Sequence, residues 1–409
     1  MGAVIGDQKH QGAVHVPEKG EGRMKSAGTK QTCTLFATLT AAIPALALAC
    51  AAGAWLPQPA EAAGKHKIFL AMSYIGNDWQ AEAANMVRAM AASADLKDRV
   101  ELQVQVSGPN AQRQIQQINS MVQAGAEAIV VYPISPTALN QVVRAACRKG
   151  VMIIAYDAAI TEPCAYNVAI DQTEAGRVTA QWLADRLHGK GRIVAITGVP
   201  GTSVDTLRTK AAKQVFAKYP DIHIIAEAPG MWSQAVARTE LSRILATHDW
   251  DQVDGLWMQV GCFTANAMQL EAGHKPAQLK PCAGEGSNGG RIQALPADTK
   301  VDGANGAYAP LGAQRISYAS PPYSGALALK LAVQKLEGKD VPRNTVLPLP
   351  LVRNETIKLC QQGTWQEMSE GCNVFKPSAV SNPGWFASIF SQQTPEVGLR
   401  AALDAKPER

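Results

Sequence analysis

Aromatic and polar side chains gather where the apolar, strand-like runs of this sequence end. Trp79 and Trp232 each stand just beyond such an end, and an aromatic ring can pack against the C–H face of a sugar or polyol. Asp157 closes a strongly apolar run, and its carboxylate can accept charge-assisted hydrogen bonds from hydroxyl groups. Arg208 offers a planar fork of donors for vicinal hydroxyls or a carboxylate. These residue types predict a pocket for a small polar ligand, for which the candidates are Asn77, Trp79, Gln80, Asp157, Arg208, Trp232, Gln259 and Glu285.

Several of these candidates also have an ordinary structural interpretation. Trp79 stands at helical spacing among apolar residues and could belong to a core, and Asp157 could cap a helix or form an ion pair between domains. Arg208 could be a surface residue of a helix, and Gln259 could bond to loop backbone. Trp232 lies in a loop-like Pro-Gly-Met-Trp-Ser stretch, which favours the ligand interpretation.

Known enzyme motifs find little support in the sequence. The glycine-rich stretch Gly198–Ser203 follows a strand-like run but lacks the lysine of a phosphate-binding loop. No G-x-G-x-x-G follows the first strand, and no G-x-S-x-G nucleophile motif occurs. The histidines beyond residue 62 show no paired metal-ligand spacing: His66, His188, His223, His248 and His274. We therefore predict a protein that is not an enzyme and has no cofactor or metal; the rival class is a secreted hydrolase.

The elements that must position the candidates alternate between strands and helices. The chain has 409 residues, of which 46% are hydrophobic and 18% charged, as in ordinary globular proteins, and its net charge of +5 is too small to indicate nucleic-acid binding. Apolar runs such as Ile68–Met72 and Val151–Tyr156 are separated by segments with helical periodicity, and a second such set begins near Arg192. The predicted fold class is α/β, with two doubly wound parallel-sheet (Rossmann-like) lobes, whose ligands bind at the carboxyl ends of the strands.

The N-terminal residues predict export. Lys25 and Lys30 precede an uncharged, mostly apolar run from Cys33 to Leu56, and Ala60-Glu61-Ala62 is a small-x-small cleavage signal. We predict a cleaved signal peptide over residues 24–62 and a periplasmic protein, and residues 1–23 are interpreted as an extension upstream of the true start. A membrane anchor and a lipoprotein attached at Cys50 are the alternatives.

The cysteines beyond the leader predict disulfide bonds. Six remain, an even number, as is typical of exported proteins with disulfides, and the sequence leaves their connectivity open. A metal site is disfavoured because no Cys-x-x-Cys spacing occurs. The pairing of neighbours along the chain is the arrangement we favour: Cys147 with Cys164, Cys262 with Cys282, and Cys360 with Cys372.

Four segments follow one another along the chain: Ser73–Gln80, Tyr156-Asp157, Gly198–Ser203 with Arg208, and Ser320–Tyr323 before a helix. Their order and spacing resemble the periplasmic sugar-binding proteins of ABC transporters, of the ribose-binding type. The similarity extends from about residue 67 to residue 352. The sequence departs from that family's pattern where Ala158 replaces an arginine, where Val260-Gly261 replaces an asparagine-aspartate pair, and where Gln80 replaces a phenylalanine. Glu285 stands where the family usually has aspartate.

This resemblance implies a type I periplasmic binding fold in which two lobes, joined by a three-segment hinge, close around a ligand. It implies an extracytoplasmic solute-binding protein of an ABC importer that delivers a small sugar or polyol-like ligand to a membrane permease; a sensory protein that docks on a receptor is an alternative. The crossings are expected near Ala169–Asp171, Ala319–Ser320 and Leu347–Leu351. The expected ranges are 63–170 plus 320–347 for the N-terminal lobe, 171–319 plus 348–376 for the C-terminal lobe, and 377–409 for a tail packed on the second lobe and frayed at its end.

Overall fold

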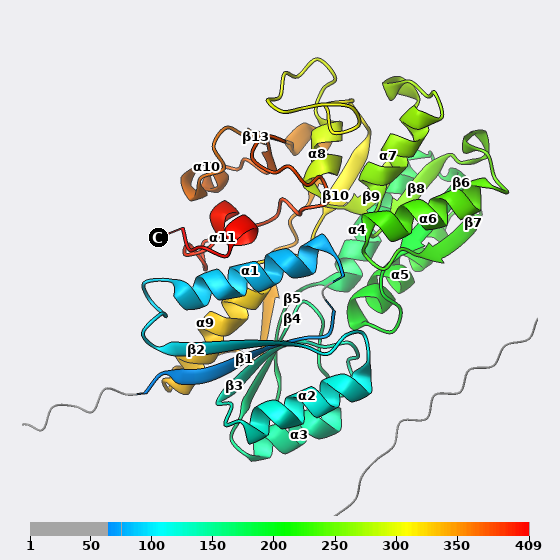
Figure 1. Ribbon diagram of the computed structural model, residues 1–409. Coiled ribbons are helices and arrows are strands. Elements are labelled where there is room, and N and C mark those ends of the chain that lie inside the picture. Colours follow the sequence, from blue (N-terminus) through cyan, green and yellow to red (C-terminus); the bar gives the residue numbers. More distant parts are fainter. Residues whose placement is uncertain (1–63, 75, 409) are drawn as a thin grey trace, which may run out of the picture. The chain divides into compact units, whose positions relative to one another are not determined.

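The computed structural model describes residues 64–74 and 76–408 (Figure 1). The predicted signal peptide and the extension before it, residues 1–62, lie outside the described residues. Among the described helices, none is both long and apolar enough to cross a membrane.

The first lobe is built on a six-stranded sheet in which every neighbouring pair is parallel. Side chains of the inner strand His66–Met72 point alternately to the two faces: Ile68 and Leu70 enter one core, whereas Phe69 and Ala71 enter the other. Both faces of the sheet are therefore buried, as is usual for parallel sheets. In spatial order the strands are β11 (Asn344–Leu347), β5 (Tyr166–Ile170), β4 (Met152–Tyr156), β3 (Ala128–Tyr132), β1 (His66–Met72) and β2 (Val100–Val106).

Helices cover the two faces of this sheet. On one side lie α1 (Asp78–Ala92) and α9 (Ser324–Leu336), and on the other lie α2 (Ala111–Gln123) and α3 (Asn140–Arg148). Helix α1 begins where Asn77 accepts a hydrogen bond from the backbone N–H of Gln80, which is an N-cap. The cap fixes the first turn of α1 directly after the carboxyl end of β1.

The second lobe repeats this plan with one antiparallel edge strand. Helices α4 (Gln172–Arg186) and α5 (Ser203–Phe216) cover one face, and α6 (Gln234–Leu245) and α7 (Cys262–Glu271) cover the other. The two doubly wound lobes confirm the predicted fold class. In spatial order the strands are β12 (Val352–Arg353), β10 (Arg315–Tyr318), β9 (Cys282–Glu285), β8 (Gly255–Met258), β6 (Lys190–Thr197) and β7 (Asp221–Pro229); the short helices are α8 (Asn288–Ala294), η1 (Trp250–Gln252), η2 (Pro276–Gln278) and η3 (Asn354–Thr356).

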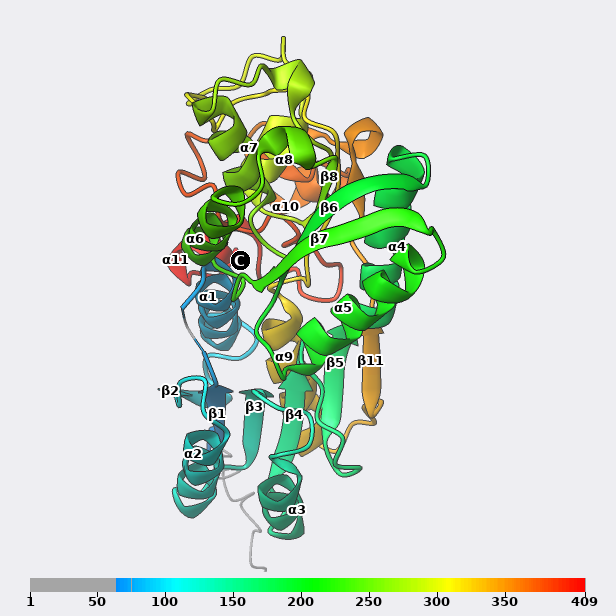
Figure 2. The ribbon, with the colours of Figure 1, turned by 90° about the vertical axis from the view of Figure 1, so that its right-hand side faces the viewer.

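The chain passes between the two sheets three times. It leaves the first sheet after β5, returns after β10 through α9 to β11, and leaves again after β11 for β12. Figure 2 shows β11 beside β5, so a late segment of the chain completes the edge of the first sheet. The passages lie close to the predicted crossings, whereas the residue limits of the lobes stay a prediction.

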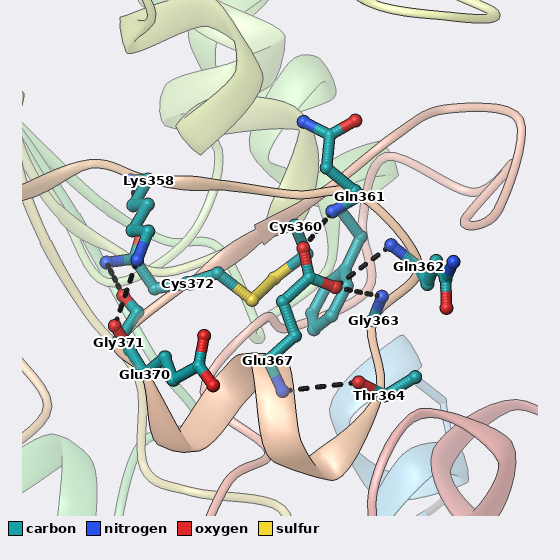
Figure 3. The surroundings of a disulfide bond; sticks show 12 residues. Lys358, Cys360, Gln361, Gln362, Gly363, Thr364, Glu367, Glu370, Gly371 and Cys372 are labelled. Carbon is teal, nitrogen blue, oxygen red and sulfur yellow. Dashed lines mark hydrogen bonds between the residues drawn. A yellow bond between two sulfur atoms is a disulfide. The ribbon is translucent and has the colours of Figure 1, made fainter.

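Three disulfides pair cysteines that are neighbours along the chain, which confirms the favoured connectivity: Cys147–Cys164, Cys262–Cys282 and Cys360–Cys372. The last one joins β13 (Leu359–Cys360) to the turn after α10 (Trp365–Ser369). Glu367 lies against this bond, and its carboxylate accepts backbone hydrogen bonds from Gln362 (2.9 Å) and Gly363 (2.8 Å) (Figure 3). Because both sulfurs are bonded to each other, this cluster offers no thiolate to a metal.

The tail was expected to pack on the second lobe and then to fray. Residues 383–388 do bond to the second lobe, but the chain then continues to the first lobe. After β14 (Val374–Phe375), the tail runs to α11 (Leu399–Asp404), which packs against α1 of the first lobe (Figure 1). Ala401 and Ala402 are buried in the first-lobe core, and the Asn85 side chain of α1 donates to the carbonyl of Ala402 at 2.9 Å. Only the expected fraying differs from the structure, because the apolar side of α11 packs against α1.

Candidate functional site

A cavity lies where strands of both sheets end. The volume of this cavity is about 40 Å³, which exceeds the roughly 10–15 Å³ that one water molecule requires. The wall comprises Asn77, Trp79, Gln80, Tyr132, Asp157, Val204, Arg208, Trp232, Gln259, Tyr318, Ala319, Ser320 and Phe386. All the predicted site residues except Glu285 are therefore brought together here.

The N-cap and the first turn of α1 supply three of the wall residues, Asn77, Trp79 and Gln80. The Trp79 indole N–H donates to the carbonyl of Ser320 at 2.7 Å, and the ring packs against Tyr132 and Tyr156, with centroids 5.8 and 6.3 Å away. Trp79 is thus a core residue and a wall residue at once. Gln80 is 1% exposed, and its Oε1 accepts no hydrogen bond from any described residue. This oxygen is available to a ligand hydroxyl.

Asp157 follows β4 in a left-handed backbone conformation, with φ of 59°. Such a conformation is uncommon outside glycine and is often found at binding sites. The side chain is 5% exposed, and Gln172 Nε2 donates to its Oδ1 at 2.9 Å. Burial raises the pKa of the Asp157 carboxyl, and the positive charge of Arg208 acts in the opposite direction.

Arg208 of α5 lies beside this carboxyl and is held from three directions. Its Nε donates to Gln172 Oε1 at 2.8 Å, its Nη2 donates to Ser320 Oγ at 2.7 Å, and its guanidinium lies 4.8 Å from the centre of the Tyr318 ring. Gln172 follows the first passage between the lobes, and Ser320 lies in the second. The ligand site and the connections between the lobes therefore share residues.

Trp232 lies in a loop with unusual backbone geometry. Met231 and Trp232 both have positive φ, 54° and 50°, which turns the indole into the cavity. A Cβ on Gly198 would overlap the Trp232 ring, so only glycine fits there. The indole N–H donates to Gln259 Oε1 at 3.0 Å.

Gln259 in turn is held by α5. Its Nε2 donates to Asp205 Oδ1 at 2.8 Å and to Thr209 Oγ1 at 3.0 Å. Asp205 Oδ1 also accepts from the backbone N–H of Gly198 at 2.6 Å. The amide of Gln259 is thus occupied by protein partners, and its role is to fix Trp232.

Glu285 lies away from the cavity, which corrects its place in the predicted ligand set. Its carboxylate accepts hydrogen bonds from the backbone N–H groups of Gly261 and Cys262 and from the hydroxyl of Ser287, and it is 1% exposed. The strand end was identified correctly, but the side chain turns toward the N-terminus of α7. A helix N-terminus offers unpaired N–H groups and favours an anion.

Six wall residues were not among the candidates: Tyr132, Val204, Tyr318, Ala319, Ser320 and Phe386. Tyr132 ends an apolar strand, so the rule that ligands bind at the carboxyl ends of strands could have identified it. Tyr318 follows no comparable signal, yet its buried hydroxyl makes no hydrogen bond with any described residue. Burial raises the pKa of Tyr318 to about 12, so the phenol is neutral and can donate.

The wall suits a neutral ligand rich in hydroxyl groups. The single carboxylate among these thirteen residues, Asp157, is matched by the single guanidinium, Arg208. Gln80 and Tyr318 offer unpaired polar atoms, while the rings of Trp79 and Trp232 offer apolar surface. This combination of aromatic faces with a few convergent polar groups is typical of small-molecule sites.

Comparison with known sequences supports this reading. A family described as "Periplasmic binding protein domain" matches residues 68–340. The xylitol-binding protein of Mycolicibacterium smegmatis is 34% identical over 179 residues, 43% of this chain and 51% of that protein. The D-xylose-binding periplasmic protein of Escherichia coli is 24% identical over 195 residues, 47% of this chain and 52% of that protein. The matches span about half the length of these curated relatives.

Solved structures share the fold. An ABC transporter solute-binding protein from Thermobispora bispora has a TM-score of 0.64 at 24% identity, and the match covers 80% of this chain and 92% of that one. A Caulobacter myo-inositol-binding protein bound to myo-inositol has a TM-score of 0.60 at 20% identity, with 71% and 94% covered. At these identities the likeness concerns the fold alone.

Proposed function

Because this chain belongs to the periplasmic binding protein domain family, we propose that it is the extracytoplasmic solute-binding protein of an ABC importer. It captures a small sugar or polyol between its lobes and delivers it to a membrane permease. The observation that carries the proposal is the cavity at the strand ends of both sheets, where Trp79, Asp157, Arg208 and Trp232 meet. Two relatives are named as a xylitol-binding and a D-xylose-binding protein, and these names support a sugar or polyol as the ligand.

Capture involves no covalent step. The lobes exchange between open and closed arrangements, and a ligand that contacts both lobes favours the closed one through its higher affinity for it. Asp157 and Arg208 bond to hydroxyl groups, and the indoles cover the C–H faces. The closed form then docks on the permease. We propose that the protein is periplasmic and is exported by the signal peptide over residues 24–62. We also propose that the lobes have the residue limits given above.

The ligand enters a site that is already partly organised by Gln172 and Ser320. Both residues bond to Arg208 and both lie at passages between the lobes. Ligand contacts with Asp157 and Arg208 are therefore transmitted directly to the segments about which the lobes move. This arrangement supports closure as the response to binding.

The test is thermal unfolding of the protein against pentitols, hexitols, inositol, pentoses, hexoses, amino acids and nucleosides. A ligand that binds only the folded state at 100 times its dissociation constant raises the free energy of unfolding by about 2.7 kcal/mol. We expect this rise with one or a few sugars or polyols. Stabilisation by amino acids or nucleosides alone would contradict the ligand class, and turnover of the bound compound would support the hydrolase alternative.

A further inference from the structure

We propose that the tail segment, residues 382–388, forms a third wall of the ligand cavity, and that its Phe386 is a specificity-determining contact. Phe386 lines the cavity, although it lies far along the chain from every other wall residue. The family match ends at residue 340, so this wall lies outside the matched domain. The inference rests on the proposed function, because it concerns the choice among sugars and polyols.

The tail segment is fixed to the first lobe beside the cavity. The side chain of Asn382 donates to Asp78 Oδ1 at 2.9 Å, and the backbone N–H of Phe386 donates to Glu82 Oε1 at 2.7 Å. A Cβ on Gly384 would overlap the Asp78 carboxylate, so the backbone at Gly384 lies directly against this side chain of α1. Asp78 and Glu82 belong to the opening turns of α1, which also supply Trp79 and Gln80 to the cavity.

The same segment is fixed to the second lobe through its backbone. The N–H of Asn288 donates to the carbonyl of Trp385 at 2.5 Å, and the N–H of Gly289 donates to that of Pro383 at 2.8 Å. Arg291 Nη2 donates to Ser388 Oγ at 2.7 Å. The Phe386 ring is thus positioned by hydrogen bonds to both lobes and not by the ligand alone.

Glu82 is the positioning residue for this ring. Its side chain is completely buried, and Phe386 N–H is its bonded partner, while Oε2 has no hydrogen-bond partner among the described residues. A buried acceptor that holds one backbone N–H fixes that peptide, since the N–H would otherwise lose its partner away from water. The peptide in turn fixes where the Phe386 ring meets the cavity.

The consequence for ligand choice is steric. An aromatic ring packs against the C–H face of a sugar or polyol and limits the length or breadth of what fits. Removing the ring should weaken ligands that match the present cavity and relatively favour larger ones. A ring that served only to fill the tail's own packing would change stability without changing this order of preference.

The experiment measures dissociation constants of the full protein for a graded set of polyols and sugars with four to seven carbons. It compares wild type with Phe386→Ala and Phe386→Leu, and with the control Phe390→Ala. Phe390 is also a partly buried residue of the tail, and the centre of its ring lies 5.2 Å from that of Trp365. It does not line the cavity. Thermal unfolding of every variant verifies that it folds, and Phe386→Leu keeps the test decisive should the alanine variant not fold.

We expect Phe386→Ala to weaken the best wild-type ligand by about tenfold or more and to shift the preference toward larger compounds. Phe390→Ala should stay within about twofold of wild type. Glu82→Leu should shift the preference as Phe386→Ala does, whereas Glu82→Gln, which keeps an acceptor oxygen, should restore the wild-type order. If the wild type binds these compounds and Phe386→Ala and Phe386→Leu keep its order and affinity, the tail-wall inference fails alone. If the wild type binds none of them, the proposed function fails first.

Discussion

The two sides of the cavity hold their polar groups differently. On the second-lobe side, Trp232, Gln259 and Asp205 are joined to one another by hydrogen bonds, and the Gln259 amide has protein partners at both ends. On the first-lobe side, Gln80 Oε1 accepts no hydrogen bond within the described residues, although the residue is almost completely buried. The network around Trp232 is complete without a ligand, whereas Gln80 Oε1 and, at the end of β10, the Tyr318 hydroxyl have no partner within the described residues.

This difference assigns different work to the two sides. A buried acceptor without a partner costs about 1–3 kcal/mol, and a ligand hydroxyl that bonds to it recovers part of that cost. A network that is already complete reduces the ordering required when the ligand arrives. We therefore expect Gln80 to bond directly to the ligand and the Trp232 network to contribute a rigid aromatic surface.

The largest expected effect lies at the carboxylate of the first-lobe side. Asp157→Asn keeps the shape but loses the charge, and hydrogen bonds to charged groups are worth about 1.5–3 kcal/mol, so affinity should fall by at least about tenfold. Isothermal calorimetry with the stabilising ligand measures this. The control Glu285→Gln changes a buried carboxylate outside the cavity and should leave affinity within about twofold. Equal losses in both variants would show that Asp157 acts through the fold.

A matched pair of amide substitutions separates the two sides. Gln80→Leu removes an unpaired acceptor, so affinity should fall by about 1–2 kcal/mol while the unfolding free energy of the ligand-free protein does not fall. Gln259→Leu leaves Trp232 Nε1 and Asp205 without this partner, so affinity and stability should both fall, each by about 1–2 kcal/mol. Denaturant unfolding and calorimetry measure the two quantities. Equal losses of stability in both variants would contradict the difference between the unpaired Gln80 and the paired Gln259.

The smallest expected effect is a pH dependence of the unfolding free energy, which arises from Glu82 on the first-lobe side. Burial raises the pKa of Glu82 well above its ordinary value, and the nearby charge of Asp78 acts in the same direction. The folded protein therefore keeps this proton at pH values where the unfolded chain has lost it, so the unfolding free energy falls as pH rises above about 4.3. Glu82→Gln should remove that part of the slope. An unchanged slope in urea unfolding over this range would contradict the assignment.

Much of the fold could be predicted because parallel strands are buried on both faces. Runs such as Ile68–Met72 and Met152–Tyr156 are almost entirely apolar, and the rule that ligands bind at the carboxyl ends of strands placed Asn77, Trp79 and Asp157 correctly at the cavity. Strand β5, Tyr166–Ile170, was not recognised as a strand, because it is short and the polar Asn167 interrupts its apolar run.

The remaining site residues depended on contacts between distant parts of the chain. Glu285 was placed at a strand end correctly, but the sequence does not show that its side chain turns to the N–H groups of α7. Gln172 carries no motif, and its importance follows only from its simultaneous bonds to Asp157 and Arg208. Phe386 could not be predicted, because its place in the wall depends on how the tail returns across both lobes.

The return of α11 onto α1 affects the order in which the chain can complete its structure. The first-lobe core contains Ile68 near one end of the described residues and Ala402 near the other. One core of the second lobe draws its buried members only from residues between Val194 and Cys282. A growing or partly exported chain can therefore assemble that second-lobe core from a continuous middle stretch. The first-lobe core that contains Ala402 has to await residues far later in the chain, so a shorter chain lacks the packing of α11 against α1.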